Sequence, residues 1–389
     1  MKLKRVPEDF QVEELTAVQP EGGDYAFYRL TKKSLGTPEA IDRLVSRLKV
    51  QRHRISYGGL KDKHAITRQY VTIRFGPRHG GRFDAVELEY LGQVDRAFTP
   101  QHISGNRFHI VLRDLSASAL EQALRAVDEV TVHGFPNYFD DQRFGSLGAS
   151  GEFVAQAWCR GDYERALWLA LADHHPDDRR EEREQKALLR EYWGRWIECK
   201  GVLERSHRRS IVTYLADKPP DNPDYRGAFA RLKIDLRGLY LSAFQSHLWN
   251  QLLVRLLVDT VPESERFAVT LRTGDVPFFR TIGPEATPGL RGTELPLPSA
   301  RLHLPPGPEL DRIEQVVREH GLELRELRVK YPRDSFFSKG SRKALVEPAA
   351  VERESASDDL YPGRYKLALS FDLPRGSYAT MLVKRITEC

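Results

Sequence analysis

The sequence predicts an α+β protein whose main sheet is largely antiparallel. Segments with strand and helix character interleave along the chain. The strand segments alternate apolar and polar residues, which favours antiparallel sheets with one solvated face over buried parallel sheets. The chain has 389 residues, more than a single hydrophobic core usually serves, so two domains are expected.

The composition and the N-terminus indicate a cytoplasmic protein. Hydrophobic residues make up 40% of the chain and charged residues 30%. No run approaches the roughly 18 apolar residues that a membrane span needs, so no membrane association is expected. The basic start turns acidic at Glu8 and Asp9 and contains Pro7, where a signal peptide would continue with an apolar core.

Neither a cofactor nor a metal is expected. The sequence contains no phosphate-binding loop, no glycine-rich dinucleotide motif, no His-Glu-x-x-His and no nucleophile elbow. Cys159, Cys199 and Cys389 form no Cys-x-x-Cys pair, which argues against a disulfide framework or a thiolate zinc site. No feature indicates an obligatory protein partner. The net charge of +5 permits an acidic partner such as RNA without requiring one.

The first elements are two strands and a helix. A strand beginning at Phe10 reads as a sheet edge, and residues 25–30 form the next strand. A helix follows, with Thr37 as a possible cap and Pro38 in its first turn. Its apolar positions have helical spacing, and its other face and exit are basic. Such cations usually form a solvated face, but with an RNA substrate they become candidates for phosphate contacts: Arg43, Arg47, Lys49, Arg52, His53 and Arg54.

A turn with one carboxylate comes next, within residues 57–69. Asp62 lies between Lys61 and Lys63, after two glycines, and leads into a predicted strand at residues 69–75. Close cations favour the ionised form of a carboxylate, typically lowering its pKa by ~1–3 units. A charged oxygen nucleophile is one interpretation of this turn, and an ordinary solvated hairpin turn is the other.

Further strands are predicted at residues 86–91 and 107–113, followed by a helix at 116–130. Residues 134–145 then form an aromatic-rich loop. Its rings could plug the domain, or they could stack on an unpaired base, a contact worth ~1–3 kcal/mol.

The middle of the chain reads as a separate domain. It contains predicted helices at residues 153–172, 239–258 and 310–320, a solvated charged run at 174–186, and loops at 276–308. The final segment returns to strand at residues 365–371 and breaks at 373–377. By pattern alone, Tyr378 beyond this break is a strand aromatic.

Four stretches resemble motifs of the TruD family of RNA pseudouridine synthases, at residues 4–14, 59–69, 137–145 and 373–380. They occur in the family's order and span nearly the whole chain. The resemblance implies that Asp62 is the catalytic nucleophile and that the substrate is bound by Phe10, Asn137, Phe139 and Tyr378. Lys4, counted with these substrate-binding residues, or a neighbouring cation is expected to steady Asp62 electrostatically. One departure is Asp140, which stands where the family commonly has glycine.

The resemblance also implies the pseudouridine synthase fold, interrupted by an α/β-type insertion domain. Residues 1–148 and 346–389 would form the catalytic domain and residues 149–345 the insertion. The implied activity is isomerisation of a uridine in tRNA to pseudouridine, with uridine 13 as the usual target and no cofactor. The aspartate could attack the sugar or the base, or act through a glycal route, and the residues do not choose among these.

Two other functions are weighed against this one. A non-catalytic RNA-binding or RNA-folding module would keep the basic and aromatic features but would not need Asp62. A hydrolytic carboxylate enzyme would need a second acid paired with Asp62, and the motifs contain none.

Overall fold

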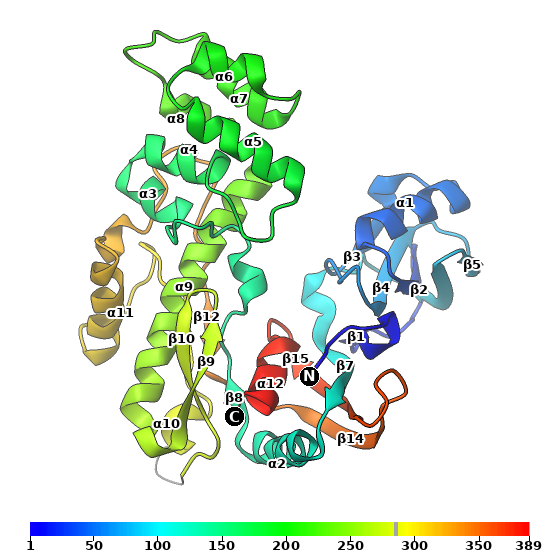
Figure 1. Ribbon diagram of the computed structural model, residues 1–389. Helices are drawn as coiled ribbons and strands as arrows, with labels where there is room; N and C mark the ends of the chain where they lie inside the picture. Colours follow the sequence, from blue (N-terminus) through cyan, green and yellow to red (C-terminus); the bar gives the residue numbers. More distant parts are fainter. Residues whose placement is uncertain (284–286, 389) are drawn as a thin grey trace. The chain divides into compact units, whose positions relative to one another are not determined.

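The computed structural model describes residues 1–283 and 287–388. Its contacts divide the chain into two compact units (Figure 1). The first unit comprises residues 1–135 and the C-terminal segment from Val346, and the second comprises residues 136–345. The chain leaves the first unit at β8 (Phe135–Pro136) and returns at β13 (Leu345–Val346). Cys389 lies outside the described residues.

The first boundary between the two units lies between residues 135 and 136, whereas residue 148 was expected. Residues 136–148 group with the second unit. The physical reason is a set of polar contacts with its longest helix. The Asn250 side chain binds the backbone of Phe139, and Arg143 donates to the Ser242 hydroxyl at 2.7 Å.

The first unit is built on a nine-stranded mixed sheet, which confirms the predicted α+β class. The strand order is β14-β15-β7-β1-β4-β2-β6-β5, with β3 also paired to β4. β1 and β4 run parallel, and the other pairs run antiparallel. The strands are β1 (Phe10–Thr16), β2 (Tyr25–Lys33), β3 (Ile55–Tyr57), β4 (Ile66–Arg74), β5 (Gly81–Phe83), β6 (Val86–Val94), β7 (Ile103–Leu115), β14 (Ala349–Ser357) and β15 (Tyr365–Pro374).

The strand that begins at Phe10 is not a sheet edge, so that prediction was wrong. β1 lies between β7 and β4. Pro7 belongs to the short 3₁₀ helix η1 (Pro7–Asp9) that precedes the strand, so its missing N–H interrupts no hydrogen bond of the ladder.

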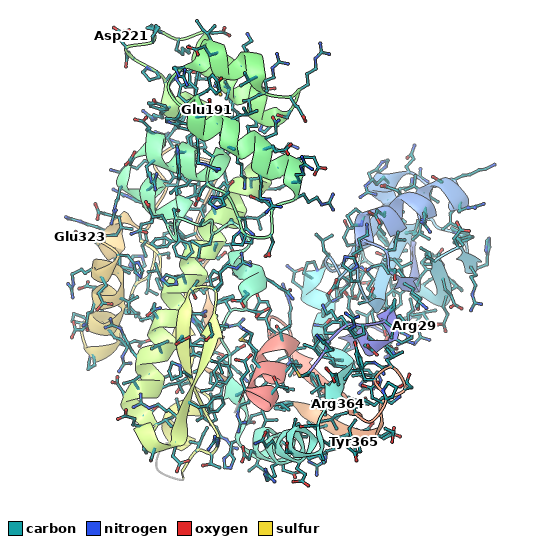
Figure 2. All side chains as sticks on the ribbon, in the orientation of Figure 1. Arg29, Glu191, Asp221, Glu323, Arg364 and Tyr365 are labelled. Carbon is teal, nitrogen blue, oxygen red and sulfur yellow. The ribbon has the colours of Figure 1, made fainter. Side chains whose placement is uncertain are left out.

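Two helices pack on this sheet, and a third packs on one of them. α1 (Thr37–Leu48) buries Ile41 and Leu44 in one core cluster with Leu30, Val71 and Leu88 of the sheet. α2 (Ala117–His133) packs against β7 and β15 and against α12 (Ala379–Thr387). The other side of the sheet carries charged pairs. One joins Arg29 of β2, labelled in Figure 2, to Glu89 of β6, with their charged atoms 2.5 Å apart. Alternation predicted a solvated face, and this side is solvated only in part, because a second core cluster of Phe27, Val94, Phe98 and Ile103 covers the rest.

Two local predictions in the first unit were wrong. Gly36, not Thr37, is the N-cap of α1, because the Thr37 hydroxyl is buried and donates to the Gln69 side chain instead. Residues beyond Gly376 form α12, not a strand, and Tyr378 is its N-cap. The β-branched residues there favour a strand locally. Burial of Met381 and Leu382 on a helix packed against α2 prevails.

The second unit is mainly helical and is organised around α9 (Ile234–Thr260), which contains the predicted core helix. α3, α11, β10 and β11 all contact α9. The other elements are α3 (Val154–Arg160), α4 (Tyr163–Leu171), α5 (Arg180–Glu191), α6 (Trp196–Val202), α7 (His207–Ala216), α8 (Tyr225–Ala230), β9 (Arg266–Leu271), β10 (Gly274–Phe279), α10 (Thr287–Leu290), β11 (Glu294–Pro296), α11 (Pro308–Glu319) and β12 (Ser341–Lys343). Its small sheets pair β9 with β10 and β11 with β12, both antiparallel.

The single helix expected at residues 153–172 is two helices. Gly161 ends α3 in the left-handed conformation, at φ +80°, which glycine adopts without strain. Asp162 then caps α4 by accepting a hydrogen bond from the Arg165 amide at 2.9 Å. The charged run at 174–186, expected to be solvated, includes the first turns of α5. Among the described residues, no helix has both the length and the apolar character needed to cross a bilayer.

Candidate active site

Asp62 lies in the loop that joins β3 to β4, and buried polar groups fix the loop's shape. The Thr37 hydroxyl accepts a hydrogen bond from the Lys61 amide at 3.0 Å and donates to Gln69 at 2.8 Å. Gln69 in turn donates to the Gly59 carbonyl at 3.3 Å. A Cβ at Gly58 would lie 2.3 Å from the Ile103 side chain, so a larger residue there would require that side chain to move. The loop is therefore anchored on both sides of Leu60.

The Asp62 carboxylate is held in its ionised form. Lys4 donates to one oxygen at 2.5 Å, and the His64 amide donates to the other at 2.9 Å. Burial acts to raise the pKa of Asp62, but the Lys4 hydrogen bond, the His64 amide and the Lys4 charge outweigh it and lower the pKa. The side chain keeps 31% of its surface exposed. It is thus a charged oxygen that an outside molecule can reach.

Lys4 connects Asp62 to the ring of Phe10. Its ammonium nitrogen lies 4.0 Å from the centre of that ring, within the range of a cation–π contact. Phe10 is 7% exposed and packs edge-on against Phe108 of β7. The structure therefore brings together three of the six residues singled out from the sequence: Lys4, Phe10 and Asp62.

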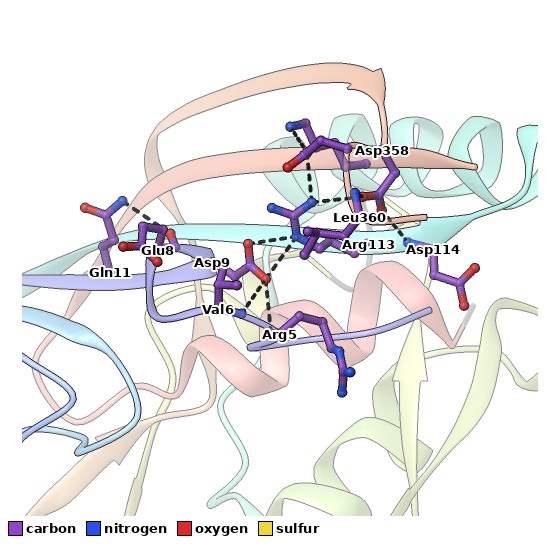
Figure 3. Close-up of polar contacts among 11 residues, drawn as sticks. Arg5, Val6, Glu8, Asp9, Gln11, Arg113, Asp114, Asp358 and Leu360 are labelled. Carbon is purple, nitrogen blue, oxygen red and sulfur yellow. Dashed lines mark hydrogen bonds and ion pairs between the residues drawn. The ribbon is translucent and has the colours of Figure 1, made fainter. Parts of the chain in front are cut away.

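The segment that carries Lys4 and Phe10 is fastened by the carboxylate between them, Asp9 (Figure 3). Asp9 accepts the amides of Arg5 at 3.0 Å and Val6 at 3.2 Å, and pairs with Arg113 of β7 at 2.8 Å. Arg113 also donates to Asp358 at 2.9 Å. Asp9 is 1% exposed, so its negative charge depends on this arginine.

Lys32 of β2 supports the loop from the protein interior. It is fully buried and donates to three backbone carbonyls, those of Leu35 at 2.5 Å, Asp62 at 2.7 Å and Lys61 at 3.4 Å. Burial lowers the pKa of Lys32 to about 8, although the nearby Asp62 charge acts to raise it.

Lys61 points away from Asp62 and into the sheet. Its ammonium group pairs with Glu14 of β1 at 3.0 Å and donates to Asn106 of β7 at 2.8 Å. Glu14 also accepts the Tyr70 amide at 2.8 Å and has no exposed surface. Burial raises the pKa of Glu14, and the Lys61 charge opposes that rise. Lys61 is thus mainly an anchor of the loop.

Phe139, in the second unit, is enclosed by polar and aromatic groups. The Asn250 side chain accepts the Phe139 amide at 2.9 Å and donates to the Phe139 carbonyl at 3.0 Å. The Phe139 ring meets Trp249 edge-on at 5.5 Å, and the Arg342 guanidinium lies 4.2 Å from its centre. Phe139 is 8% exposed.

Asn137 is fixed by the same arginine. Arg342 donates to its side-chain oxygen at 2.5 Å and to its backbone carbonyl at 2.8 Å. The Asn137 amide group donates to the Lys343 carbonyl at 2.9 Å, and the residue is 5% exposed. An amide group offers two donor hydrogens and two acceptor lone pairs, so each atom keeps capacity for one more partner.

Comparison with known proteins identifies the family. The family model described as tRNA pseudouridine synthase D (TruD) matches residues 1–386. The chain belongs to the TruD family. It is therefore a pseudouridine synthase, an isomerase that acts on uridine in tRNA.

Individual relatives of the TruD family match along the whole chain. A probable tRNA pseudouridine synthase D from Methanocaldococcus jannaschii is 30% identical, over 99% of this chain and 91% of the relative. The tRNA pseudouridine synthase D of Leptospira interrogans is 29% identical, over 99% and 95%. A crystal structure of a putative TruD from Methanosarcina mazei superposes with a TM-score of 0.76 at 26% identity, covering 100% of this chain and 93% of that one.

Two further residues of the TruD motifs can be placed in the fold. Tyr378 is half-buried and is the N-cap of α12. Asp140, the departure from the family pattern, is 3% exposed and precedes the 3₁₀ helix η4 (Asp141–Phe144). Within the described residues, no group of three or more histidine, cysteine or carboxylate side chains is placed to hold a metal.

Sequence reasoning missed several residues that build this TruD site. Lys32 and Glu14 were overlooked although strand alternation points to them. Lys32 shares the inward face of β2 with Leu30, and Glu14 shares that of β1 with Val12. A charged residue in an inward register is uncommon and marks a buried polar contact. Arg342 and Trp249 carried no comparable local signal.

Proposed function

We propose that Asp62 is the nucleophile with which this TruD-family enzyme converts one uridine of tRNA to pseudouridine. The observation that carries the proposal is an ionised, partly exposed carboxylate held by Lys4 and the His64 amide beside the ring of Phe10. The reaction breaks the N1–C1′ bond, turns the uracil and joins C5 to C1′. It needs neither an oxidant nor an external energy source.

The residues around Asp62 suit a reaction in which its carboxylate is first a free anion, then bonded to the substrate, and then free again. If Asp62 attacks C1′, the N1–C1′ bond breaks and uracil leaves with the bonding electrons. C5 then attacks C1′ as the carboxylate leaves, the proton on C5 is given up and N1 takes up a proton, so that the net change is an isomerisation. Attack on the base and a glycal route are the alternatives. In each case Lys4 balances the charge that returns to Asp62.

Four aromatic or polar residues complete the proposed substrate contacts. Phe10 offers its ring beside Lys4, and Tyr378 offers a half-buried side chain. We assign Asn137 and Phe139 to binding of the target nucleotide, with Arg342 setting their positions. Base extrusion would expose the uracil to these groups. The proposed target is uridine 13 in the D-arm region, and the proposed compartment is the cytoplasm.

The test is an Asp62→Asn variant, measured both for tRNA binding and for pseudouridine formation. Retained binding with no product is the expected result. Asp95→Asn serves as the control, because Asp95 is an exposed carboxylate of the same unit paired with a neighbouring arginine. Unchanged product formation by Asp62→Asn would contradict the nucleophile assignment and favour a role for Asp62 in structure alone.

The target is tested by mapping pseudouridines in tRNA from cells with and without the gene. Loss confined to position 13, restored by the wild-type gene but not by the Asp62→Asn gene, is expected. Loss at another position would change the assigned target without changing the assigned chemistry.

A further inference from the structure

Leu60, two residues before Asp62, is the most exposed leucine among the described residues. Its exposed fraction is 69%. Full burial of a leucine side chain is worth ~1.5–3 kcal/mol, and Leu60 contributes almost none of that to folding. A single exposed leucine is ordinary on a protein surface. What sets Leu60 apart is how its backbone is held.

The two residues that flank Leu60 are both tied to buried groups. Gln69 donates to the Gly59 carbonyl on one side, and the Thr37 hydroxyl accepts the Lys61 amide on the other. Thr37 and Gln69 are fully buried and bonded to each other. The Lys61 side chain is further anchored to Glu14 and Asn106. A short loop fixed at both ends presents the leucine outward with little freedom to fold back.

The surroundings of Leu60 match a nucleic acid better than an apolar surface. The same loop carries Lys63, which is about half exposed and pairs with Glu39, and His64, and it adjoins the Lys4–Asp62 pair. A cationic rim suits phosphates. An apolar side chain projecting from such a rim suits the space between stacked bases, where proteins insert leucine or phenylalanine wedges.

We propose that Leu60 enters the base stack of the tRNA at the position that the target uridine vacates. This inference rests on the proposed function, in which the uridine leaves its stack to reach Asp62. Unstacking costs a few kcal/mol per step, and a wedge that fills the gap offsets part of this cost. Because Leu60 precedes Asp62 by only two residues in a fixed loop, the distance between the wedge and the nucleophile stays constant.

The experiment measures single-turnover pseudouridine formation by Leu60→Ala on two substrates. One is the folded tRNA. The other is the same tRNA assembled with abasic nucleotides on both sides of the target, so that the uridine has no stack to leave. We expect Leu60→Ala to be slower by about tenfold or more on the first, since tenfold corresponds to ~1.4 kcal/mol, and within about twofold of wild type on the second.

Two companion variants make the outcome specific. Leu60→Met keeps an apolar side chain of similar size and should restore most of the rate on folded tRNA. Leu360→Ala, which truncates another exposed leucine of the same unit, should leave both rates unchanged. Equal slowing of Leu60→Ala on both substrates, or no slowing on either, would overturn the wedge.

A fluorescent base reports the same event without chemistry. With 2-aminopurine next to the target, the Asp62→Asn protein should raise the fluorescence on binding, and the Leu60→Ala, Asp62→Asn double variant should raise it much less. Failure of the proposed function has a different signature: full activity of Asp62→Asn itself. The two ideas therefore fail separately.

Discussion

The ammonium group of Lys32 donates to the backbone carbonyl of Asp62 at 2.7 Å, while Lys4 holds the carboxylate of the same residue. Two lysines therefore fix one aspartate, one from the interior and one from the exposed side. Lys32 has no carboxylate in direct contact, since its three bonds go to carbonyl oxygens. Asp62 and Glu39 act to raise the pKa of Lys32, and Lys61 acts to lower it.

Replacing Lys32 with methionine should lower kcat by about tenfold or more. Hydrogen bonds to a charged group are worth ~1.5–3 kcal/mol, and each 1.4 kcal/mol of lost transition-state stabilisation is about tenfold in rate. The measurement is kcat on tRNA at neutral pH, with Lys33→Met as the control. Lys33 is the next residue of β2 and is about half exposed, paired with Glu8. Equal losses in the two variants would contradict a specific role for Lys32.

Because of Lys32, the kcat of the wild-type enzyme should fall as pH rises through about 8. Burial lowers its pKa from the ordinary 10.5 to about 8, so the charge behind Asp62 is lost as pH rises through that value. Between about pH 8 and 10.5 the unfolded chain binds this proton more tightly than the folded one. The Lys32 contribution to the free energy of unfolding therefore rises with pH there, while activity falls. In Lys32→Met the limb near pH 8 should be absent from kcat.

Lys4→Met should shift the acid limb of kcat/KM to higher pH. In the wild type, burial pushes the pKa of Asp62 up, but Lys4 is the largest influence holding it down. Without Lys4, burial is opposed mainly by the His64 amide. A depressed carboxylate pKa stabilises the folded state above the unfolded pKa and loses that effect as pH falls through the folded one, so the variant should also unfold more readily at neutral pH.

The control for this shift is Lys2→Met, which removes an equal charge from an exposed side chain two residues away. The acid limb is obtained by measuring kcat/KM between about pH 3 and pH 7 at constant ionic strength. Identical limbs in Lys4→Met and wild type would show that Asp62 does not depend on Lys4 for its charge.

Arg113→Met should destabilise the first unit by ~3–5 kcal/mol, because removing one partner of a buried ion pair leaves the other charge uncompensated. The uncompensated groups would be Asp9 and Asp358, both almost fully buried. Urea unfolding measures the change. Arg96→Met, at an exposed ion pair, should change stability by less than about 1 kcal/mol. A small loss of stability in Arg113→Met would mean that Asp9 gains access to water, and would contradict its dependence on Arg113.

How far the sequence predicts this fold depends on whether local pattern and tertiary packing agree. The alternation of β7 and the helical spacing of α1 agree with their surroundings, and both elements were predicted. The segment after Gly376 does not: its composition favours a strand, but packing on α2 makes it α12. Likewise the pattern that begins at Phe10 suggested a sheet edge, whereas Pro7 lies in η1 and β1 lies inside the sheet.

The residues of the site also divide into those that local motifs reveal and those that only the folded structure reveals. Asp62, Lys4 and Phe10 lie in motifs that are short and local, so they could be selected from sequence, and the structure brings them together. Arg342 could not be selected, because its role depends on Asn137, more than 200 residues earlier in the chain. Its contact arises only when β12 is folded beside the loop that precedes η4.

Asn250→Ala should loosen the Phe139 loop and leave the Asp62 chemistry intact. The Asn250 side chain is 1% exposed and satisfies both the amide and the carbonyl of Phe139. Truncation leaves these two buried groups without partners, at a cost of ~1–3 kcal/mol each. We expect a fall in stability of that order, faster hydrogen exchange at the Phe139 amide, and a raised KM for tRNA. The acid limb of kcat/KM should not move, because Lys4 and His64 still set the pKa of Asp62.

Asn222→Ala, at an exposed turn of the same unit, is the matched control. A displaced acid limb in Asn250→Ala would contradict this separation, since it would make the Phe139 loop a determinant of the charge on Asp62.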